Sequence, residues 1–307
     1  MPKLLSLKLD HLALISIISF SACTPHINID EAQLAALELI ISPSASPSAS
    51  PSASPSPWIR QMGAPGSYTD AYAVATDNDG SVLAAGYTNG SLGTNSLIGN
   101  QDAFIIKYDS IGEMLWAKQL GAQNSNTGAN TVSTDKEGNI LVAGYTLGSL
   151  EGFSRTGRGD LFVIKYDSLG NQKWLNQVGS ENSYTTAFGV AADQLGNVFV
   201  TGNTSGLLAG DSRIGTYDVI IIKYNSNGEQ QWIRQIGADS ASTTPNSAAT
   251  DQSGNLYVTG FTLGSLTGEP RTGLYDFFLT KYNTNGDQQG SNKWDHLALT
   301  LLPLQLR

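Results

Sequence analysis

The chain has 307 residues, of which only 14% are charged, against roughly 25% in typical soluble domains. Glycine is abundant, at 33 residues, and many short apolar runs favour a turn-rich β protein over a disordered chain. The formal net charge is −9 and basic clusters are missing. This charge balance argues against nucleic acid as a partner and against polybasic attraction to anionic lipid.

Cysteine and histidine are scarce. The single cysteine, Cys23, excludes an internal disulfide, and the three histidines (His11, His26 and His296) lie outside the repeated region described below. Histidine is the commonest general base and metal ligand. We therefore expect no histidine-based catalytic site, no metal and no cofactor in the folded body.

Residues 1–22 have the features of a signal peptide. Lys3 and Lys8 precede an apolar stretch, Leu12 to Phe20, that is too short to span a bilayer. The stretch ends in Ser-Ala-Cys, which resembles a bacterial lipobox. We therefore predict that Cys23 is the lipid-attachment residue, which places the protein at the bacterial cell envelope, on the outer membrane or cell surface. The alternative is ordinary secretion, with cleavage near Ala22.

Two segments separate the signal peptide from the repeats. Residues 23–41 form a mature N-terminal segment with a candidate short helix after Asp30. Residues 42–57 are a Ser/Pro/Ala linker in which proline recurs every four residues. A segment with nothing apolar larger than alanine cannot form a core, so we predict a stiff, extended spacer. Such a spacer would hold a domain away from a membrane anchor.

From Trp58 onward the sequence repeats four times with one fixed period, the spacing from Trp58 to Trp116, and without insertion or deletion. The repeated positions include tryptophan (Trp58, Trp116, Trp174, Trp232), aspartate (Asp77, Asp135, Asp193, Asp251), glycine (Gly86, Gly144, Gly202, Gly260) and lysine (Lys107, Lys165, Lys223, Lys281). A strict period of this length indicates a repeat architecture.

Each unit contains four candidate strands, which in the first unit are residues 71–77, 81–88, 102–109 and 113–120. Short glycine-bearing turns join the first to the second and the third to the fourth, as in antiparallel hairpins. The second and third strands are apolar on both faces, which implies burial on both sides. We therefore predict an all-β fold, a β-propeller of four four-stranded blades. An open β-solenoid is the alternative architecture.

Four motifs recur in this register: W-x-x-Q-x-G, A-T-D-x-x-G-N, V-x-G-x-T and D-x-F-x-x-K-Y-(D/N). Together they resemble the bacterial seven-bladed β-propeller (SBBP) repeat, over residues 58–289. The resemblance implies a propeller and no single activity. The family's name implies seven blades, whereas this chain has four units.

The repeat breaks at residues 290–307. Gly290 stands where a fifth tryptophan is due. Restoring one base before the Gly290 codon regenerates W-x-x-Q-x-G, so we predict an aberrant, frameshifted tail; the alternative is a natural tail in which Trp294 replaces the missing tryptophan. The last unit then lacks its fourth strand. The propeller is closed by pairing of the N-terminal strand 58–62 with that unit, or it is left as an open arc.

The residues that recur in every unit are assigned structural roles. Each Asp-x-x-Gly turn offers one acid, too few for calcium, so the repeated aspartates are interpreted as turn caps. The repeated tryptophans are interpreted as packing residues and not as a carbohydrate platform.

Candidate ligand-binding residues come from the long loops. Three arginines at equivalent positions, Arg155, Arg213 and Arg271, have the chemistry to receive carboxylates or sulfates. The alternatives are surface salt bridges to neighbouring acids (Glu151, Asp211, Glu269) or inter-blade contacts.

The repeats contain no catalytic triad, cysteine nucleophile or phosphate-binding loop, so we predict that the protein is not an enzyme. The leading interpretation is a lipid-anchored envelope propeller that acts as a binding or scaffolding module for a protein or a glycan. One alternative is a polysaccharide hydrolase or lyase on a propeller scaffold. The other is the truncated product of a decayed gene with no present role.

Overall fold

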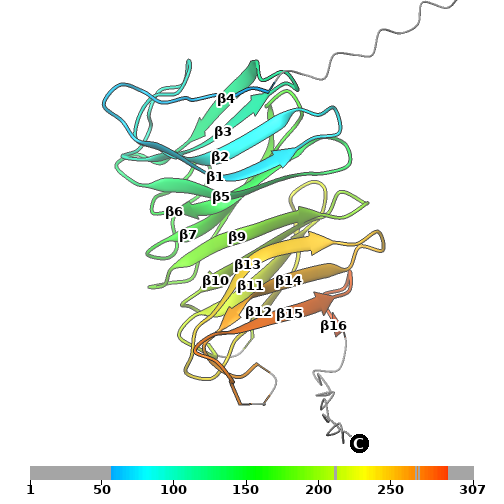
Figure 1. Ribbon diagram of the computed structural model, residues 1–307. Helices are drawn as coiled ribbons and strands as arrows, with labels where there is room; N and C mark the ends of the chain where they lie inside the picture. Colours follow the sequence, from blue (N-terminus) through cyan, green and yellow to red (C-terminus); the bar gives the residue numbers. More distant parts are fainter. Residues whose placement is uncertain (1–56, 211–212, 267, 269, 290–307) are drawn as a thin grey trace, which may run out of the picture. The chain divides into compact units, whose positions relative to one another are not determined.

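The computed structural model describes residues 57–210, 213–266, 268 and 270–289 (Figure 1). The predicted signal peptide, Cys23, the segment 23–41, the linker apart from Pro57, and the tail 290–307 lie outside the described residues. Within the described ranges, no helix has the length and apolar character needed to cross a membrane.

The described chain forms sixteen strands in four antiparallel sheets of four, here called blades 1 to 4. Blade 1 holds β1 (Thr69–Thr76), β2 (Val82–Thr88), β3 (Asp102–Tyr108) and β4 (Met114–Leu120). Blade 2 holds β5 (Thr127–Thr134), β6 (Ile140–Thr146), β7 (Asp160–Tyr166) and β8 (Gln172–Val178). Blade 3 holds β9 (Thr185–Ala192), β10 (Val198–Thr204), β11 (Asp218–Tyr224) and β12 (Gln230–Ile236). Blade 4 holds β13 (Thr243–Thr250), β14 (Leu256–Thr262), β15 (Asp276–Tyr282) and β16 (Gln288–Gln289).

The strand order in each blade follows the chain, so every blade is a meander. The predicted strands are present, with ends displaced by one or two residues. The hairpin turns close on glycines that adopt positive φ, such as Gly80 at 77° and Gly112 at 84°. A left-handed conformation of this kind has little steric cost only for glycine.

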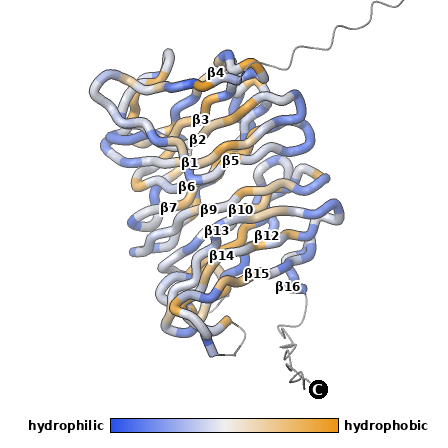
Figure 2. Tube along the Cα trace, viewed as in Figure 1, coloured by the Kyte–Doolittle hydropathy of each residue, from blue (hydrophilic) through white to orange (hydrophobic). Residues whose placement is uncertain are grey.

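The blades stack face to face in chain order. The first strands β1, β5, β9 and β13 lie side by side, and three apolar clusters fill the spaces between successive blades. Strands β3, β7 and β11 are buried along their whole length. Figure 2 shows the apolar residues concentrated along the strands, while the connecting loops are largely hydrophilic. The predicted propeller of four blades is therefore confirmed.

The two ends of the stack differ from its middle. Leu279 of β15 is 54% exposed, whereas its counterpart Val163 of β7 is fully buried. At the other end, Val74 of β1 is 70% exposed, whereas its counterpart Val132 is buried. Residues 58–62 belong to none of the described sheets and do not pair with blade 4. Within the described residues, no strand pairing closes the ring.

The segment 58–62 lies on blade 1. The Trp58 ring packs near Tyr108, with ring centroids 6.0 Å apart, and Met62 joins the same apolar cluster. A Cβ placed on Gly112 would lie 2.6 Å from the Trp58 ring. Glycine at this turn therefore makes room for the tryptophan, and this packing keeps the segment at the first blade.

The repeated glycine of V-x-G-x-T sits where two strands approach most closely. A Cβ on Gly144 would lie 1.9 Å from the Gly128 carbonyl oxygen on β5.

We predict that Gly144→Ala lowers the free energy of unfolding by at least about 2 kcal/mol, because neither backbone can move without breaking the hydrogen bonds between β5 and β6. Denaturant unfolding measures this. Gly63→Ala is the control, since its nearest heavy atom would be 4.0 Å away. Equal stability of the two variants would contradict the prediction.

Candidate binding surface

The long connections of every blade lie along one edge of the stack, here called the loop face. These connections are the second-to-third links (89–101, 147–159, 205–217, 263–275) and the fourth-to-first links (121–126, 179–184, 237–242). Parallel bridges join a second-to-third link of one blade to the fourth-to-first link that follows it, as between Gln101 and Asn126. The loops therefore form a continuous surface across the blades.

A buried aspartate and a glutamine hold each long loop in place. Asp102, fully buried at the start of β3, accepts hydrogen bonds from the Ile98 and Gly99 amides, each at 2.8 Å. Gln119 on β4 donates to the same carboxylate at 3.2 Å, while its side-chain oxygen accepts from the Leu92 amide. These two side chains bond to backbone amides at both ends of the loop. The position of the loop therefore does not depend on which side chains lie between those ends.

The same clamp recurs in the next two blades, where Gln177 pairs with Asp160 and Gln235 with Asp218. The glutamine is the one in W-x-x-Q-x-G. Sequence analysis recognised both residues as repeated, but their pairing was missed because they lie 17 residues apart on different strands. The signal available in the sequence was that the aspartate and the glutamine recur with the same strict period.

The three candidate arginines occupy equivalent places on the loop face, and all three are exposed. Each donates from Nη1 to the backbone carbonyl eight residues earlier: Arg155 to Leu147, Arg213 to Ser205, and Arg271 to Leu263. Arg271 Nη1 also donates to the Leu274 carbonyl, and in all three residues these bonds engage only part of a guanidinium that carries five N–H donors. The arginines thus brace their own loops and still present donors at the surface. Of the acids weighed as partners, Asp211 and Glu269 lie outside the described residues.

A cluster of tyrosines marks the loop face of blade 1. The rings of Tyr72 and Tyr87 stack with centroids 5.4 Å apart, and Tyr68 meets Tyr87 edge-on at 5.9 Å. The Tyr72 hydroxyl donates to that of Tyr87 at 3.1 Å. Tyr68 and Tyr72 are 50% and 59% exposed. These three residues, here called the tyrosine cluster, form an aromatic surface open to solvent.

The tyrosine cluster does not repeat. The equivalent residues are Asn126, Asn130 and Tyr145 in blade 2, Tyr184, Phe188 and Asn203 in blade 3, and Ser242, Asn246 and Phe261 in blade 4. Only the first unit is aromatic at all three positions. The cluster was not predicted from the sequence, because the prediction used residues that all four units share. The three tyrosines occur together in the first unit only.

The Tyr87 hydroxyl stays protonated at neutral pH. The hydrogen bond shared with Tyr72, and next the hydrogen bond with the Asp70 carboxylate, raise the pKa of Tyr87 above its ordinary value. Neutral phenol groups both donate and accept hydrogen bonds. The cluster therefore offers flat apolar ring faces edged by uncharged polar groups.

At the opposite edge, the repeated aspartates lie in the first turn of each blade. Asp135 Oδ1 accepts from the Glu137 and Asn139 amides, and its Oδ2 lies 2.8 Å from Lys165 Nζ. Asp77 and Lys107 form the same buried ion pair at 2.8 Å. Burial would raise the pKa of Asp135, but the Lys165 and Asn139 hydrogen bonds outweigh it and hold that pKa below its ordinary value. This ion pair was not predicted, since the aspartate lies in the first turn of the blade and the lysine on its third strand.

The lysines and tryptophans tie each blade to the next. Lys107 Nζ donates to the Ser168 carbonyl of blade 2, and Lys223 Nζ to the Thr284 carbonyl of blade 4. Indole N–H groups reach the same row of turns, pairing Trp58 with Ser110, Trp116 with Ser168, Trp174 with Ser226, and Trp232 with Thr284. These recurring residues therefore lie at the junctions between blades.

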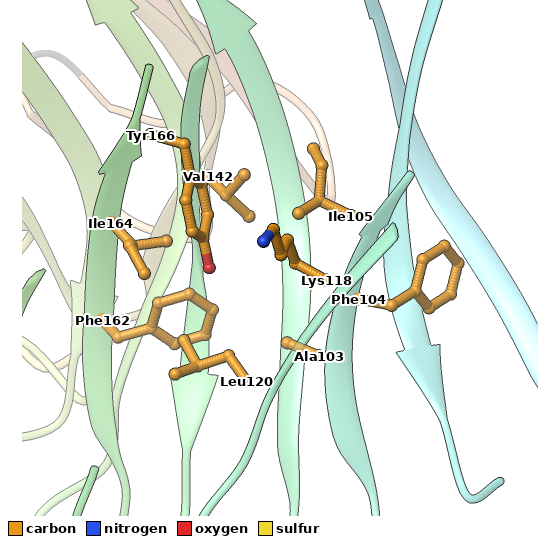
Figure 3. Close-up of a pocket in the computed structure, with 9 residues that line it drawn as sticks. All are labelled: Ala103, Phe104, Ile105, Lys118, Leu120, Val142, Phe162, Ile164 and Tyr166. Carbon is orange, nitrogen blue, oxygen red and sulfur yellow. The ribbon is translucent and has the colours of Figure 1, made fainter. Parts of the chain in front are cut away.

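A small gap remains between blades 1 and 2. Figure 3 shows Ile105, Ala103 and Leu120 of blade 1 facing Phe162 and other apolar side chains of blade 2. Its lining is part of the apolar cluster between these blades. Lys118 and the Tyr166 ring complete the lining, which is otherwise apolar and narrow, so the gap is a space left in the packing between the two blades. Within the ranges that the structure covers, no group of three or more His, Cys, Asp or Glu side chains is placed to hold a metal ion.

The fold and these repeated contacts define a protein of the β-propeller repeat class. The sequence pattern of the family described as SBBP, beta-propeller repeat, matches residues 58–93, 115–151, 173–209 and 231–266. The chain belongs to this family, as the repeated motifs predicted.

Two curated proteins resemble parts of the chain. One is the uncharacterized WD repeat-containing protein L264 of Acanthamoeba polyphaga mimivirus, 25% identical over 193 residues, which cover 48% of this chain and 13% of the relative. The other is the regulatory protein FlaEY of Caulobacter vibrioides, 26% identical over 148 residues, with 43% of this chain and 15% of the relative covered. The chain thus spans about a seventh of the length of either relative.

Solved structures with a similar course of the chain include several enzymes. An α-L-arabinofuranosidase of Fusarium graminearum has a TM-score of 0.44 at 12% identity, covering 71% of this chain and 65% of its own. A polysaccharide lyase acting on ulvan has a TM-score of 0.41 at 14% identity, with 72% and 57% covered. A gluconolactonase of Xanthomonas campestris has a TM-score of 0.37 at 12% identity, with 71% and 60% covered. Similarity at this level assigns no activity to this chain.

These comparisons correct one expectation. Sequence analysis predicted that the protein is not an enzyme, but the similar structures include a glycoside hydrolase, a lyase and a lactonase. The prediction rested on the lack of histidine and cysteine in the repeats. That ground was insufficient, because a pair of carboxylates alone is able to hydrolyse glycosides.

The buried ion pair gives a pH-dependent prediction. Lys165→Met leaves the Asp135 carboxylate buried without its cation, and we expect a loss of about 3–5 kcal/mol at pH 7. Asp135 has a folded-state pKa below its unfolded value of about 3.9, so its contribution is present above that value and lost as the pH falls through the folded pKa. The difference between parent and variant should therefore shrink below about pH 4.

Urea unfolding between pH 3 and pH 8 measures both effects. Lys136→Met, at an exposed position in the same turn, is the control and should change the unfolding free energy by less than about 0.5 kcal/mol. A loss that stays constant across this pH range would show that the ion pair is not its source.

Proposed function

We propose that the protein is a lipid-anchored binding module of the bacterial envelope whose loop face takes a glycan. The observation that supports this most is the tyrosine cluster. It is an exposed group of three aromatic rings that is confined to one blade, whereas a residue that recurs in every blade is accounted for by the blade itself.

The chemistry of the cluster suits a sugar. A pyranose ring has an apolar C–H face and a rim of hydroxyl groups, which match an exposed aromatic face edged by neutral hydroxyls. The stacked Tyr72 and Tyr87 rings hold each other in place, so little conformational entropy is lost on binding. These features favour a glycan over a flat protein surface as the ligand.

The arginines suggest which glycans bind best. Arg155, Arg213 and Arg271 add positive charge to the same loop face, and guanidinium groups pair with carboxylates and sulfates in a bidentate manner. Uronate-containing or sulfated oligosaccharides should therefore bind more tightly than neutral ones of equal length.

The experiment measures binding of the parent protein to immobilised neutral, uronate-containing and sulfated oligosaccharides. We predict that Tyr72→Ala combined with Tyr87→Ala weakens binding at least tenfold, or about 1.4 kcal/mol, by removing the stacking surface. Tyr184→Ala, at an exposed tyrosine of blade 3, is the matched control and should bind like the parent.

Two results would count against the proposal: failure of the parent to bind any of these glycans, or equal binding by the double variant. Incubation with the corresponding polysaccharides, followed for new chain ends, tests the hydrolase or lyase alternative in the same samples. Cleavage products from the parent would make the surface a substrate site.

The second part of the proposal concerns the anchor. The lipobox-like sequence that ends at Cys23, followed by a Ser/Pro spacer, would tether the propeller to a membrane and hold it clear of the lipid surface. We predict that the parent incorporates a labelled fatty-acid analogue and fractionates with membranes, and that Cys23→Ala does neither, because the thiol is the attachment point. Exported but unlabelled parent protein would show ordinary secretion instead.

A further inference from the structure

Both ends of the blade stack present an apolar face that is covered everywhere else in the protein. On blade 4, Phe277 and Leu279 are 76% and 54% exposed. Their counterparts in the three preceding blades are all buried, namely Ala103, Ile105, Leu161, Val163, Val219 and Ile221. On blade 1, Val74 is exposed, whereas its counterparts Val132 and Val190 are buried. Between blades 1 and 2, 2 and 3, and 3 and 4, a face like that of blade 4 packs against a face like that of blade 1. The two exposed faces are therefore the two sides of the same kind of interface.

The segment 58–62 occupies the place of a fourth strand in a blade preceding blade 1, and the described residues include no other strand of such a blade. Trp58 donates to the Ser110 carbonyl of blade 1, as Trp116 of β4 donates to Ser168 of blade 2. Arg60 Nε donates to the Gly112 carbonyl, as Arg234 of β12 donates to Gly286. The segment thus makes the contacts of a fourth strand with the following blade, without a third strand beside it.

Blade 4 is described up to the first residues of its fourth strand. Its strands β13, β14 and β15 are complete, and within the described residues β15 pairs with β16 at Lys281 and Tyr282. The spacing that separates Trp174 from Trp232 places the next equivalent of Trp58 at position 290. By repeat position, the segment 58–62 follows directly on Gln289, and within the described residues β15 from Asp276 to Thr280 has a partner strand on one side only.

We propose that two copies of this chain dock head to tail. Residues 58–62 of each copy pair with β15 of the other, and each blade 1 covers the apolar face around Phe277 and Leu279. The two junctions are equivalent and together close a ring of eight blades. A head-to-tail surface either closes in this way or polymerises, and eight blades lie within the usual range of about four to eight.

The repeats fix the register of this junction. Third and fourth strands pair Ile105 with Lys118 in blade 1 and Ile221 with Arg234 in blade 3. The same repeat spacing places Leu279 opposite Arg60 of the partner subunit. Paired residues on adjacent antiparallel strands have Cβ atoms about 4.5–5.5 Å apart, within reach of a disulfide after modest adjustment.

Cysteine cross-linking tests the proposal. The full chain carrying Arg60→Cys and Leu279→Cys, with Cys23→Ser to remove the remaining thiol, is exported into an oxidising compartment and analysed without reductant. We expect a covalent dimer holding two disulfides. Ile59→Cys with Leu279→Cys is the matched control, because a slip of one residue points the two side chains to opposite faces. It should give less than about a tenth of the cross-linked product.

Each other outcome overturns the proposal. An intrachain disulfide would mean that one copy closes on itself, and a ladder of larger products would mean an open polymer. A monomer without cross-links would mean that the two faces do not meet.

A second measurement does not depend on disulfide chemistry. Sedimentation of the full chain in mild detergent should show a dimer, which Phe277→Glu converts to monomer by placing a charge in the junction. Leu195→Glu is the control, since Leu195 is equally exposed, at 77%, but lies in the β9–β10 turn. It should remain dimeric. A monomeric parent, or loss of the dimer in both variants, would contradict the proposal.

Discussion

Each sheet of this protein has two apolar faces, and the rest of the structure depends on covering both of them. A four-stranded meander alone buries too little surface to be stable, so each blade depends on its neighbours. The interior blades meet this requirement and their third strands are buried throughout. The same requirement explains why the tryptophans, lysines and turn glycines recur without change. All four tryptophans, and the lysines Lys107 and Lys223, bond to the turn of the following blade.

The repeat made the fold predictable. Strand positions, antiparallel hairpins and burial on both faces follow from patterns that lie within a short stretch of sequence. The turn position of Asp135 is of this kind, because its partners in the turn are two and four residues away. Its pairing with Lys165 is not, because it depends on which side chains of different strands face each other. The Asp102–Gln119 clamp escaped prediction for the same reason.

The candidate site was least predictable. Arg155 and its two counterparts were found from sequence because they repeat, and their hydrogen bonds show that they also brace their own loops. The tyrosine cluster was missed because it is a departure from the repeat. In a protein built from equal units, shared residues report on the scaffold, and departures from the pattern are the better guide to what one surface does.

Lys107 and Lys223 each donate to a main-chain carbonyl of the following blade, at Ser168 and Thr284. No side-chain substitution in the accepting turn removes that acceptor. If a whole unit were inserted or lost, the blades that become neighbours would still offer the same main-chain carbonyl as acceptor. Recombination between repeats therefore changes the length of the array without requiring a new interface, while the loops, held at both ends by the aspartate and glutamine, are free to diverge one unit at a time.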